Sequence, residues 1–225
     1  MLPTHRNVLR PLGVCLDARF PTCLLTEYCA GGSLDAYVRH RKPSYRKVLI
    51  MAIDVAEGLR HLHEHHIVHR DLAARNLLMT RERVIKVADF GLARNTQQDG
   101  YTTKSTHGPL KWMPPESVEQ QVFSRKSDVW SFGVTLWELM ARSAPYPSLT
   151  PAQACIQIIT QNLRLPCPDG CPRRFYDTML ACWTIDVQQR PTLDALLERL
   201  TELLTDENRL DASDDDDDDG DGDDD

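Results

Sequence analysis

One stretch of the sequence, SDVWSFGVTLWELMAR at residues 127–142, constrains the fold more than any other. It is apolar nearly all the way round, which is typical of a helix that is buried on every side. With sixteen residues, Asp128 and Glu138 among them, it is too short and too polar to cross a bilayer. Other elements therefore have to surround it, and we expect this helix to be the hub of the core.

The other strong apolar patterns after residue 30 are also helical. The clearest is a stripe at spacings of three and four residues, which predicts a long amphipathic helix over residues 44–66. Its members are Val48, Ala52, Val55, Leu59 and Leu62. A helix signal also covers residues 33–41, another helical stretch follows Pro151, and leucines repeat on one face of residues 192–204. We interpret these leucines as core and not as a zipper, because two heptads are too few.

Short β-prone runs occur at two places. Residues 13–28 read as two strands around a turn at residues 17–21, and residues 77–79 and 84–88 read as a small hairpin. The predicted fold is therefore α+β, mainly helical, with a short piece of β-structure at the front.

The charge of the chain is divided unevenly. The formal net charge is −7, but eleven aspartates lie in the last fifteen residues, and without them 26 basic residues face 22 acidic ones. A run of aspartate and glycine repels itself and has nothing apolar to bury, so we expect a disordered acidic tail at residues 208–225. A solubilising tail is the favoured interpretation; an interaction arm for a basic partner and a weak calcium binder are the alternatives.

Cysteine usage favours an intracellular chain. The seven cysteines are scattered and odd in number, no Asn-x-Ser/Thr site occurs, and the first residues have no apolar leader. No run of eighteen apolar residues exists, so we expect no membrane segment. Cys167 and Cys171 are the only close pair, and without a second pair a zinc site there is disfavoured.

Five histidines crowd into the stretch HLHEHHIVH at residues 61–69. The zinc-protease pattern fails, because the residue four after His63 is Ile67. Surface histidines at the end of a long helix are therefore favoured over a metal site.

The residues with the clearest chemistry form an ordered series. HRDLAARN, at residues 69–76, places Asp71 five residues before Asn76, and Asp89 opens an Asp-Phe-Gly triplet eighteen residues after Asp71. Carboxylate and amide oxygens are hard donors that suit magnesium. PLKWMPPE, SDVWSFG and QRPT follow at residues 109–116, 127–133 and 189–192. Five such motifs in this order are difficult to obtain by chance.

The series resembles the large, C-terminal lobe of the protein kinases, and specifically of the tyrosine kinases, from about residue 5 to residue 204. The resemblance implies ATP and Mg²⁺ as cofactors. It implies that Asp71 orients the substrate hydroxyl and that Asn76 and Asp89 hold the metal. His69 and Phe90 match a packed pair of the family, and Asp128 is a further structural residue.

Selectivity for tyrosine has its own indications within the resemblance. Serine and threonine kinases usually carry a lysine two residues after the catalytic aspartate, whereas this chain has Ala73 there and Arg75 beyond it. Pro109, Lys111 and Trp112 resemble the segment that forms a platform under the tyrosine ring. The partner implied is a protein with a tyrosine acceptor, in an enzyme closer to the receptor type, and no nucleic acid is expected.

Two further features belong to the segment between Asp89 and Glu116. Tyr101 is its only tyrosine, and phosphate there would lie beside Arg70 and Arg94 in an ordering switch; the alternative is a plain exposed tyrosine. Glu116 and Arg190 match a buried ion pair that braces the lobe in the family.

The adenine side is represented by a hinge-like segment. Thr26 matches the gatekeeper position, Glu27 and Cys29 match the backbone that faces the purine, and Leu78 matches the pocket floor. No GxGxxG arrangement occurs, and Lys42 is the first lysine. We therefore expect residues 1–30 to be a remnant of the small lobe and hinge, and residues 31–207 to be the large lobe. Pro11 and Pro114 depart from the family pattern.

These expectations lead to three functional hypotheses. The first is a truncated tyrosine kinase, weakly active or inactive by itself, in the cytoplasm or at the cytosolic face of the plasma membrane. The second is a non-catalytic module that docks substrates or sequesters a kinase partner. The third is an acidic scaffold that works through its tail.

Overall fold

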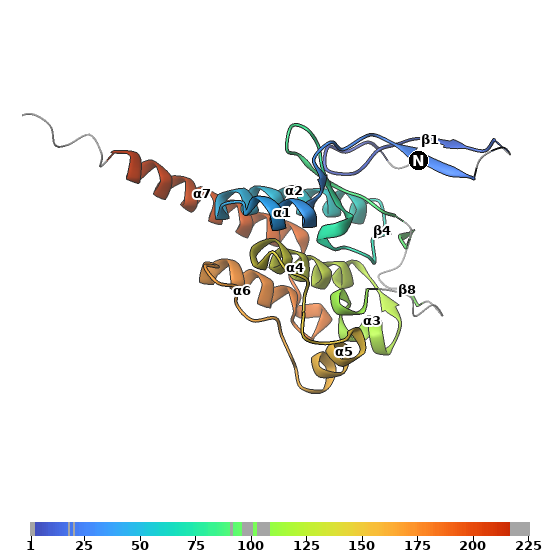
Figure 1. The fold of residues 1–225 in the computed structure, drawn as a ribbon. Coiled ribbons are helices and arrows are strands. Elements are labelled where there is room, and N and C mark those ends of the chain that lie inside the picture. The colour runs from blue at the N-terminus through green and yellow to red at the C-terminus, as the bar shows by residue number, and fades with distance from the viewer. Residues whose placement is uncertain are drawn as a thin grey trace, which may run out of the picture.

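The computed structural model describes residues 3–17, 19, 21–90, 92–95, 101–102 and 109–216. Two antiparallel strands, β1 (Pro11–Cys15) and β2 (Cys23–Thr26), form a hairpin at the front. Figure 1 shows that this hairpin projects away from a largely helical body. The predicted pair of strands around residues 17–21 is thus confirmed.

The predicted central helix is confirmed as α4 (Arg125–Ala141). Ser124 caps its first turn, since the side chain accepts from the Lys126 amide while the Ser127 hydroxyl accepts from the Ser124 amide. Thirteen residues of the helix, from Ser127 to Leu139, are buried without interruption. The helix is therefore enclosed on all sides, as its apolar pattern predicts.

Helices α1 (Leu34–Arg41) and α2 (Tyr45–Glu64) were predicted, and α2 buries every member of its apolar stripe. Helix α7 (Leu193–Asp216) lies alongside α2, as Figure 1 also shows. The structure continues α7 through residues 208–216, where the sequence predicts a disordered tail. The Asp206–Arg209 pair at 3.7 Å has the i,i+3 spacing that supports such a helix. Residues 217–225 lie outside the described part of the chain.

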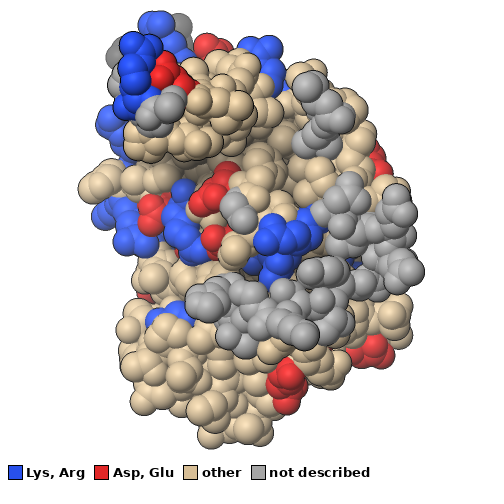
Figure 2. Space-filling model, turned by 90° about the vertical axis from the view of Figure 1, so that its right-hand side faces the viewer, with Lys and Arg blue, Asp and Glu red and all other residues tan. Residues whose placement is uncertain are grey.

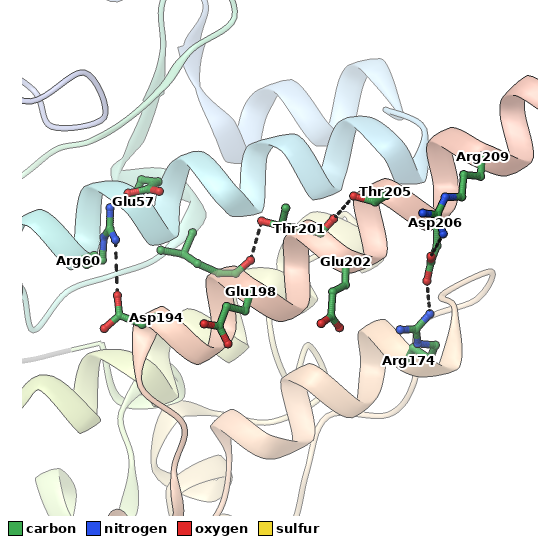
Figure 3. A pocket seen from close by; sticks show the side chains of 11 residues that line it. Glu57, Arg60, Arg174, Asp194, Glu198, Thr201, Glu202, Thr205, Asp206 and Arg209 are labelled. Carbon is green, nitrogen blue, oxygen red and sulfur yellow. Dashed lines mark hydrogen bonds and ion pairs between the residues drawn. The ribbon is translucent and has the colours of Figure 1, made fainter.

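Polar side chains border α7 on its outer side. Figure 3 shows an open groove where α7 meets α2 and α6 (Arg173–Cys182), lined mostly by charged residues. Arg60 reaches Asp194 at 3.5 Å, and Arg174 reaches Asp206 at 2.5 Å. These charges largely compensate one another across the helices.

One glycine allows α4 and α6 to approach closely. A Cβ atom on Gly133 would lie 2.6 Å from Cys182 Cβ and 2.8 Å from Trp183 Nε1. A real side chain cannot occupy that space, so the helix crossing depends on the missing Cβ. Helix α6 and the short α3 (Pro115–Glu119) were not among the predicted elements, whereas α5 (Pro151–Thr160) is the helical stretch expected after Pro151.

Small sheets position the segments that carry the motifs. Strand β3 (Gly32–Ser33) pairs with β5 (Leu77–Met79), which pairs with β6 (Ile85–Val87), so the predicted hairpin is confirmed. Strand β4 (Ile67–Val68) pairs with β7 (Arg94–Asn95), and β8 (Tyr101–Thr102) with β9 (Val122–Phe123). Three short 3₁₀ turns, η1 (Ala74–Asn76), η2 (Leu110–Trp112) and η3 (Val187–Gln189), complete the described elements.

The first described residues are bound to the body before β1 begins. The Val87 amide donates to Asn7 O and the Leu9 amide donates to Val87 O, both at 2.9 Å. Gly58 of α2 faces this contact, and a Cβ there would lie 2.3 Å from Asn7 O. Among the described residues, no helix has the length and apolar character needed to cross a membrane.

Candidate active site

Residues 69–76, which the sequence analysis expects to form the catalytic loop, are held in place by one buried carboxylate. Asp128 of α4 is completely buried, and it accepts from the His69 amide at 2.8 Å and the Arg70 amide at 2.9 Å. His63 of α2 adds its Nε2 at 2.9 Å. Arg70 has a φ of +70°, a strained conformation for a non-glycine residue that this anchoring stabilises.

The structure brings Asp71 and Asn76 together. The Asn76 side-chain amide donates to Asp71 O at 2.7 Å, across the turn η1. Because the amide nitrogen is engaged in this bond, the amide oxygen is the atom left for a cation. The site thus offers the type of oxygen donor that Mg²⁺ prefers.

Asp89 lies next to this pair. The Ala88 amide donates to Asn76 O at 2.9 Å, which places the residue after β6 beside the catalytic-loop segment. Asp89 itself is exposed and has a φ of +59°. Non-glycine residues in such conformations cluster at functional sites. The donor set of Asn76 and Asp89 fits a hard divalent cation.

His69 ties the loop to the segment that carries Asp89. Its Nε2 lies 2.9 Å from Ala88 O, and the Asp71 amide donates to its Nδ1 at 3.3 Å. These partners assign the proton to Nε2. The ring lies 5.8 Å from that of Phe90 at 58°, so the two side chains named as a packed pair are neighbours.

Arg75 connects the catalytic loop to the expected substrate platform. Its guanidinium pairs with the Asp71 carboxylate and lies 4.8 Å from the centroid of the Trp112 ring. Trp112 Nε1–H in turn donates to Glu138 at 2.8 Å. A continuous series of contacts therefore runs from Asp71 through Arg75 and Trp112 into the buried helix α4.

Glu138 is a functional candidate that the sequence analysis missed. Its Oε2 also accepts from the Ala74 amide at 3.0 Å, so one oxygen atom holds both the loop and the platform. Burial raises the pKa of this carboxyl to about 7, against the lowering effect of its two hydrogen bonds. The available signal was a charged residue, besides Asp128, inside a largely apolar helix.

The other two residues of the expected platform, Pro109 and Lys111, do not contact Arg75 in the way that Trp112 does. Pro109 precedes η2, while Lys111 turns its ammonium to Tyr146 O at 2.9 Å and so binds the body of the protein. Tyr101 pairs with Phe123 in the β8–β9 ladder, and its side chain is outside the described residues. Arg70 places its guanidinium 4.1 Å from the Phe123 ring centroid.

Glu116 and Arg190 form a bidentate ion pair at 2.6 and 2.8 Å. The Arg190 side chain is fully buried, and it also donates to Thr184 O at 2.8 Å and Lys126 O at 3.0 Å. The pair attaches α3, directly after the platform, to the start of α7.

Two of the four hinge-like residues come together beside Ala88, the residue before Asp89. Cys29 is buried in a small cluster with Leu9 and Ala88, and Leu78 packs against this cluster. Thr26 ends β2, and the Glu27 amide donates to Arg10 O at 3.1 Å. The Glu27 carboxylate is bound by Lys86 at 3.0 Å, a partner that the sequence analysis did not foresee.

Figure 2 views the molecule from the side on which the hairpin projects. In this view, basic side chains (blue) and acidic side chains (red) lie close together around a hollow in the upper half of the molecule.

The comparisons with known proteins identify the family of the chain. Residues 1–200 match the family model described as protein tyrosine and serine/threonine kinase. The chain therefore belongs to the protein kinase family, and its fold is kinase-like.

Three relatives illustrate the range of similarity. A serine/threonine-protein kinase, STY46, from Arabidopsis thaliana is 37% identical over 88% of this chain and 35% of its own length. Fibroblast growth factor receptor 1 from Xenopus laevis is 35% identical over 91% of this chain and 27% of the receptor, and that from Pleurodeles waltl is 35% identical over 95% and 29%. The chain spans about a third of the length of these relatives. One relative is named as a serine/threonine-protein kinase and the others as growth factor receptors. The relatives therefore do not determine which residue of a substrate would accept the phosphate.

Proposed function

We propose that this chain carries the catalytic and substrate-binding part of a protein kinase that transfers the γ-phosphate of ATP to a protein tyrosine. The observation that carries the proposal is the position of Arg75, whose guanidinium lies between the Asp71 carboxylate and the Trp112 ring. A phenol reaches farther than a serine hydroxyl, and the ring of Trp112 with the Arg75 cation provides a wall for an aromatic acceptor.

Each site residue has a defined task in this proposal. Asp71 orients the acceptor hydroxyl and takes up its proton. Asn76 and Asp89 hold Mg²⁺, which when bound neutralises charge on the phosphates. Thr26, Glu27, Cys29 and Leu78 surround the adenine. The location proposed is the cytoplasm, or the cytosolic face of the plasma membrane.

Tyr101 is proposed as the site of activating phosphorylation. Its backbone pairs with Phe123, on whose ring the Arg70 guanidinium lies at 4.1 Å. A phosphate introduced here adds close to two negative charges near that cation, about −1.5 to −2 at neutral pH. Arg70 is also bonded to Asp128, so the added charge acts directly on the catalytic loop.

For the 225-residue chain by itself we expect weak activity. In kinases a glycine-rich loop and a strand lysine hold the phosphates, but this sequence has no GxGxxG and no lysine before Lys42. Loss of one stabilising donor at a reacting centre commonly lowers kcat by about a hundredfold or more.

Acceptor preference is tested with two peptides that are identical except for tyrosine or serine at one position. We expect the purified chain with ATP and Mg²⁺ to label the tyrosine peptide above the serine peptide, and Asp71→Asn to remove the signal. Preferential labelling of serine would contradict the tyrosine assignment. Labelling that survives in Asp71→Asn would come from a contaminating enzyme.

Nucleotide binding is tested separately by thermal shift. ATP with Mg²⁺ should raise the melting temperature of the chain, and Asp89→Asn should reduce the shift. Equal shifts for the two proteins would mean that Asp89 does not hold the metal.

A second candidate function, a binding module for a protein partner, is favoured by the front hairpin. Leu12, Val14 and Leu24 are 58%, 56% and 62% exposed, and Tyr28 is 89% exposed. Exposed apolar groups at this density are typical of a surface that another protein covers. A basic partner for the acidic C-terminal residues belongs to the same proposal.

A further inference from the structure

The end of α2 carries a group of ligand-type side chains that the proposed kinase chemistry does not use. Among the residues that the structure describes, His61, Glu64 and His65 each place one ligand atom within 4.8 Å of the others. Their i, i+3 and i+4 spacing puts them on one face of the helix end. The i,i+4 spacing that fails between His63 and Ile67 is present between His61 and His65.

Backbone carbonyls hold one nitrogen of each histidine. His65 Nδ1 lies 2.8 Å from His61 O, and His61 Nε2 lies 3.0 Å from Pro3 O. A carbonyl oxygen can only accept, so these nitrogens carry the protons. Nδ1 of His61 and Nε2 of His65 therefore keep their lone pairs. Metal-binding histidines are usually held in this way, with the second ring nitrogen donating to a carbonyl or carboxylate.

A third histidine fixes the orientation of the first. The His5 ring stacks on His61 with centroids 4.6 Å apart and an angle of 15°, while His61 and His65 are 4.4 Å apart. His5 Nδ1 accepts from the Asn7 amide at 3.1 Å, so its proton is on Nε2 and the ring serves as packing. Glu64 is exposed, and its contact with Arg60 is long, at 3.9 Å. Its carboxylate can therefore turn to a cation.

We propose that His61, Glu64 and His65 form a binding site for Zn²⁺ or a similar divalent transition metal. Two imidazole nitrogens and one carboxylate oxygen are a suitable donor set, and three protein ligands leave the fourth position to water. Tetrahedral zinc requires ligand atoms about 3.3 Å apart. One ligand atom of each side chain already lies within 4.8 Å of the others, so the side chains have to move closer together around the ion. Exposed side chains at a helix end permit such a movement.

The position of the site indicates what the metal does. His61 binds Pro3 O and stacks on His5, so the same ring that binds the metal also holds residues 3–5 against α2. Strand β4 begins at Ile67, two residues after His65, and the segment at residues 69–76 follows it. Metal binding therefore stabilises the helix end together with the N-terminal segment.

The test is a titration of the whole chain with Co²⁺, followed by visible absorbance and calorimetry, and then displacement by Zn²⁺. We expect one Co²⁺ per chain at this site. His61→Ala and His65→Ala should each weaken binding by about a hundredfold or more, because loss of an outer-shell partner alone costs 10–100-fold. His40→Ala, which changes another histidine of the last turn of a helix, is the matched control and should leave binding unchanged.

Two outcomes would overturn the proposal. One is the absence of Co²⁺ and Zn²⁺ binding by the unaltered chain. The other is undiminished binding by the double variant His61→Ala/His65→Ala, which would place the metal at cysteines or in the acidic residues. Circular dichroism checks that the variants are folded. Alanine favours a helix, so the substitutions should not unfold α2.

Discussion

At the scale of single residues, Glu138 makes the stability of the folded protein depend on pH. Its carboxyl is 4% exposed and has a pKa of about 7, raised from 4.5 by burial. In the unfolded chain the group is ionised above about pH 4.5, whereas in the folded chain it still holds its proton up to about pH 7. The folded state binds more protons between these values, so this group makes stability fall as the pH rises from about 4.5 to 7.

Glu138→Gln should remove that pH dependence. The amide oxygen can accept from Ala74 and Trp112 as Oε2 does, but glutamine does not titrate. We expect the variant to gain stability relative to the parent at pH 8 by about 3 kcal/mol at most, and little at pH 5. Urea unfolding at both pH values measures the difference. A parallel change with pH in the two proteins would show that Glu138 is not the titrating group.

A second residue-scale prediction concerns Arg75. Arg75→Lys keeps the positive charge but loses the planar group that lies over Trp112. If the kinase proposal holds, the phosphorylation rate of the tyrosine peptide should fall by tenfold or more, which corresponds to about 1.4 kcal/mol. Thermal stability should change little, because the side chain is 40% exposed. Arg39→Lys, at another partly exposed i,i+4 pair, is the control.

At the scale of elements, the ion pair between Glu116 and Arg190 holds α3 to the start of α7. Arg190→Met leaves the Glu116 carboxylate without its buried partner, and breaking such a pair costs about 3–5 kcal/mol. Adding Glu116→Gln should restore part of the loss, since the double variant buries no unpaired charge. Arg60→Met, at a surface pair, should change stability by less than about 1 kcal/mol. Strictly additive effects of the two core substitutions would contradict direct coupling.

The crossing of α4 and α6 gives a sharper test of packing. Gly133→Ala introduces a Cβ 2.6 Å from Cys182 Cβ, and overpacking of a core typically costs about 1–3 kcal/mol. Gly13→Ala is the matched control, because nothing lies within 4 Å of a Cβ at that position. Denaturant unfolding should show a loss for the first variant only. A neutral result for Gly133→Ala would mean that the two helices can separate without penalty.

The elements differ in how far the sequence predicts them, for physical reasons. The apolar stripe of α2 and the apolar residues on all sides of α4 predict both helices, because burial decides where these helices form. Helix α6 was missed since two of its four buried positions, Thr178 and Cys182, are not strongly apolar. The order of the motifs, through the resemblance to the kinases, predicts that Asp71, Asn76 and Asp89 lie close together. The bonds from Glu138 to Ala74, 64 residues away, depend on tertiary contact and have no local signal.

At the scale of the whole molecule, the front hairpin exposes large apolar side chains to solvent. Val14 and Leu24 are paired directly across β1 and β2 and are both more than half exposed. Leu12, at an irregularity of β1, and Leu16, directly after β1, are exposed as well, at 58% and 78%. The hairpin edges are also unpaired with any further strand in the described part of the chain. An exposed apolar face with open edges favours association.

We therefore expect the chain to self-associate through this hairpin when no partner is present. Val14→Glu with Leu24→Lys places opposite charges at one cross-strand pair, which keeps the hairpin while making its face polar. Light scattering over a concentration series should show association of the parent and a monomer for the double variant, with melting temperatures within a few degrees. A matched pair of substitutions at Ile156 and Ile185, exposed at 59% and 51% on the body, should leave association unchanged. Association that persists in the hairpin variant and ends in the body variant would place the contact surface on the helical body.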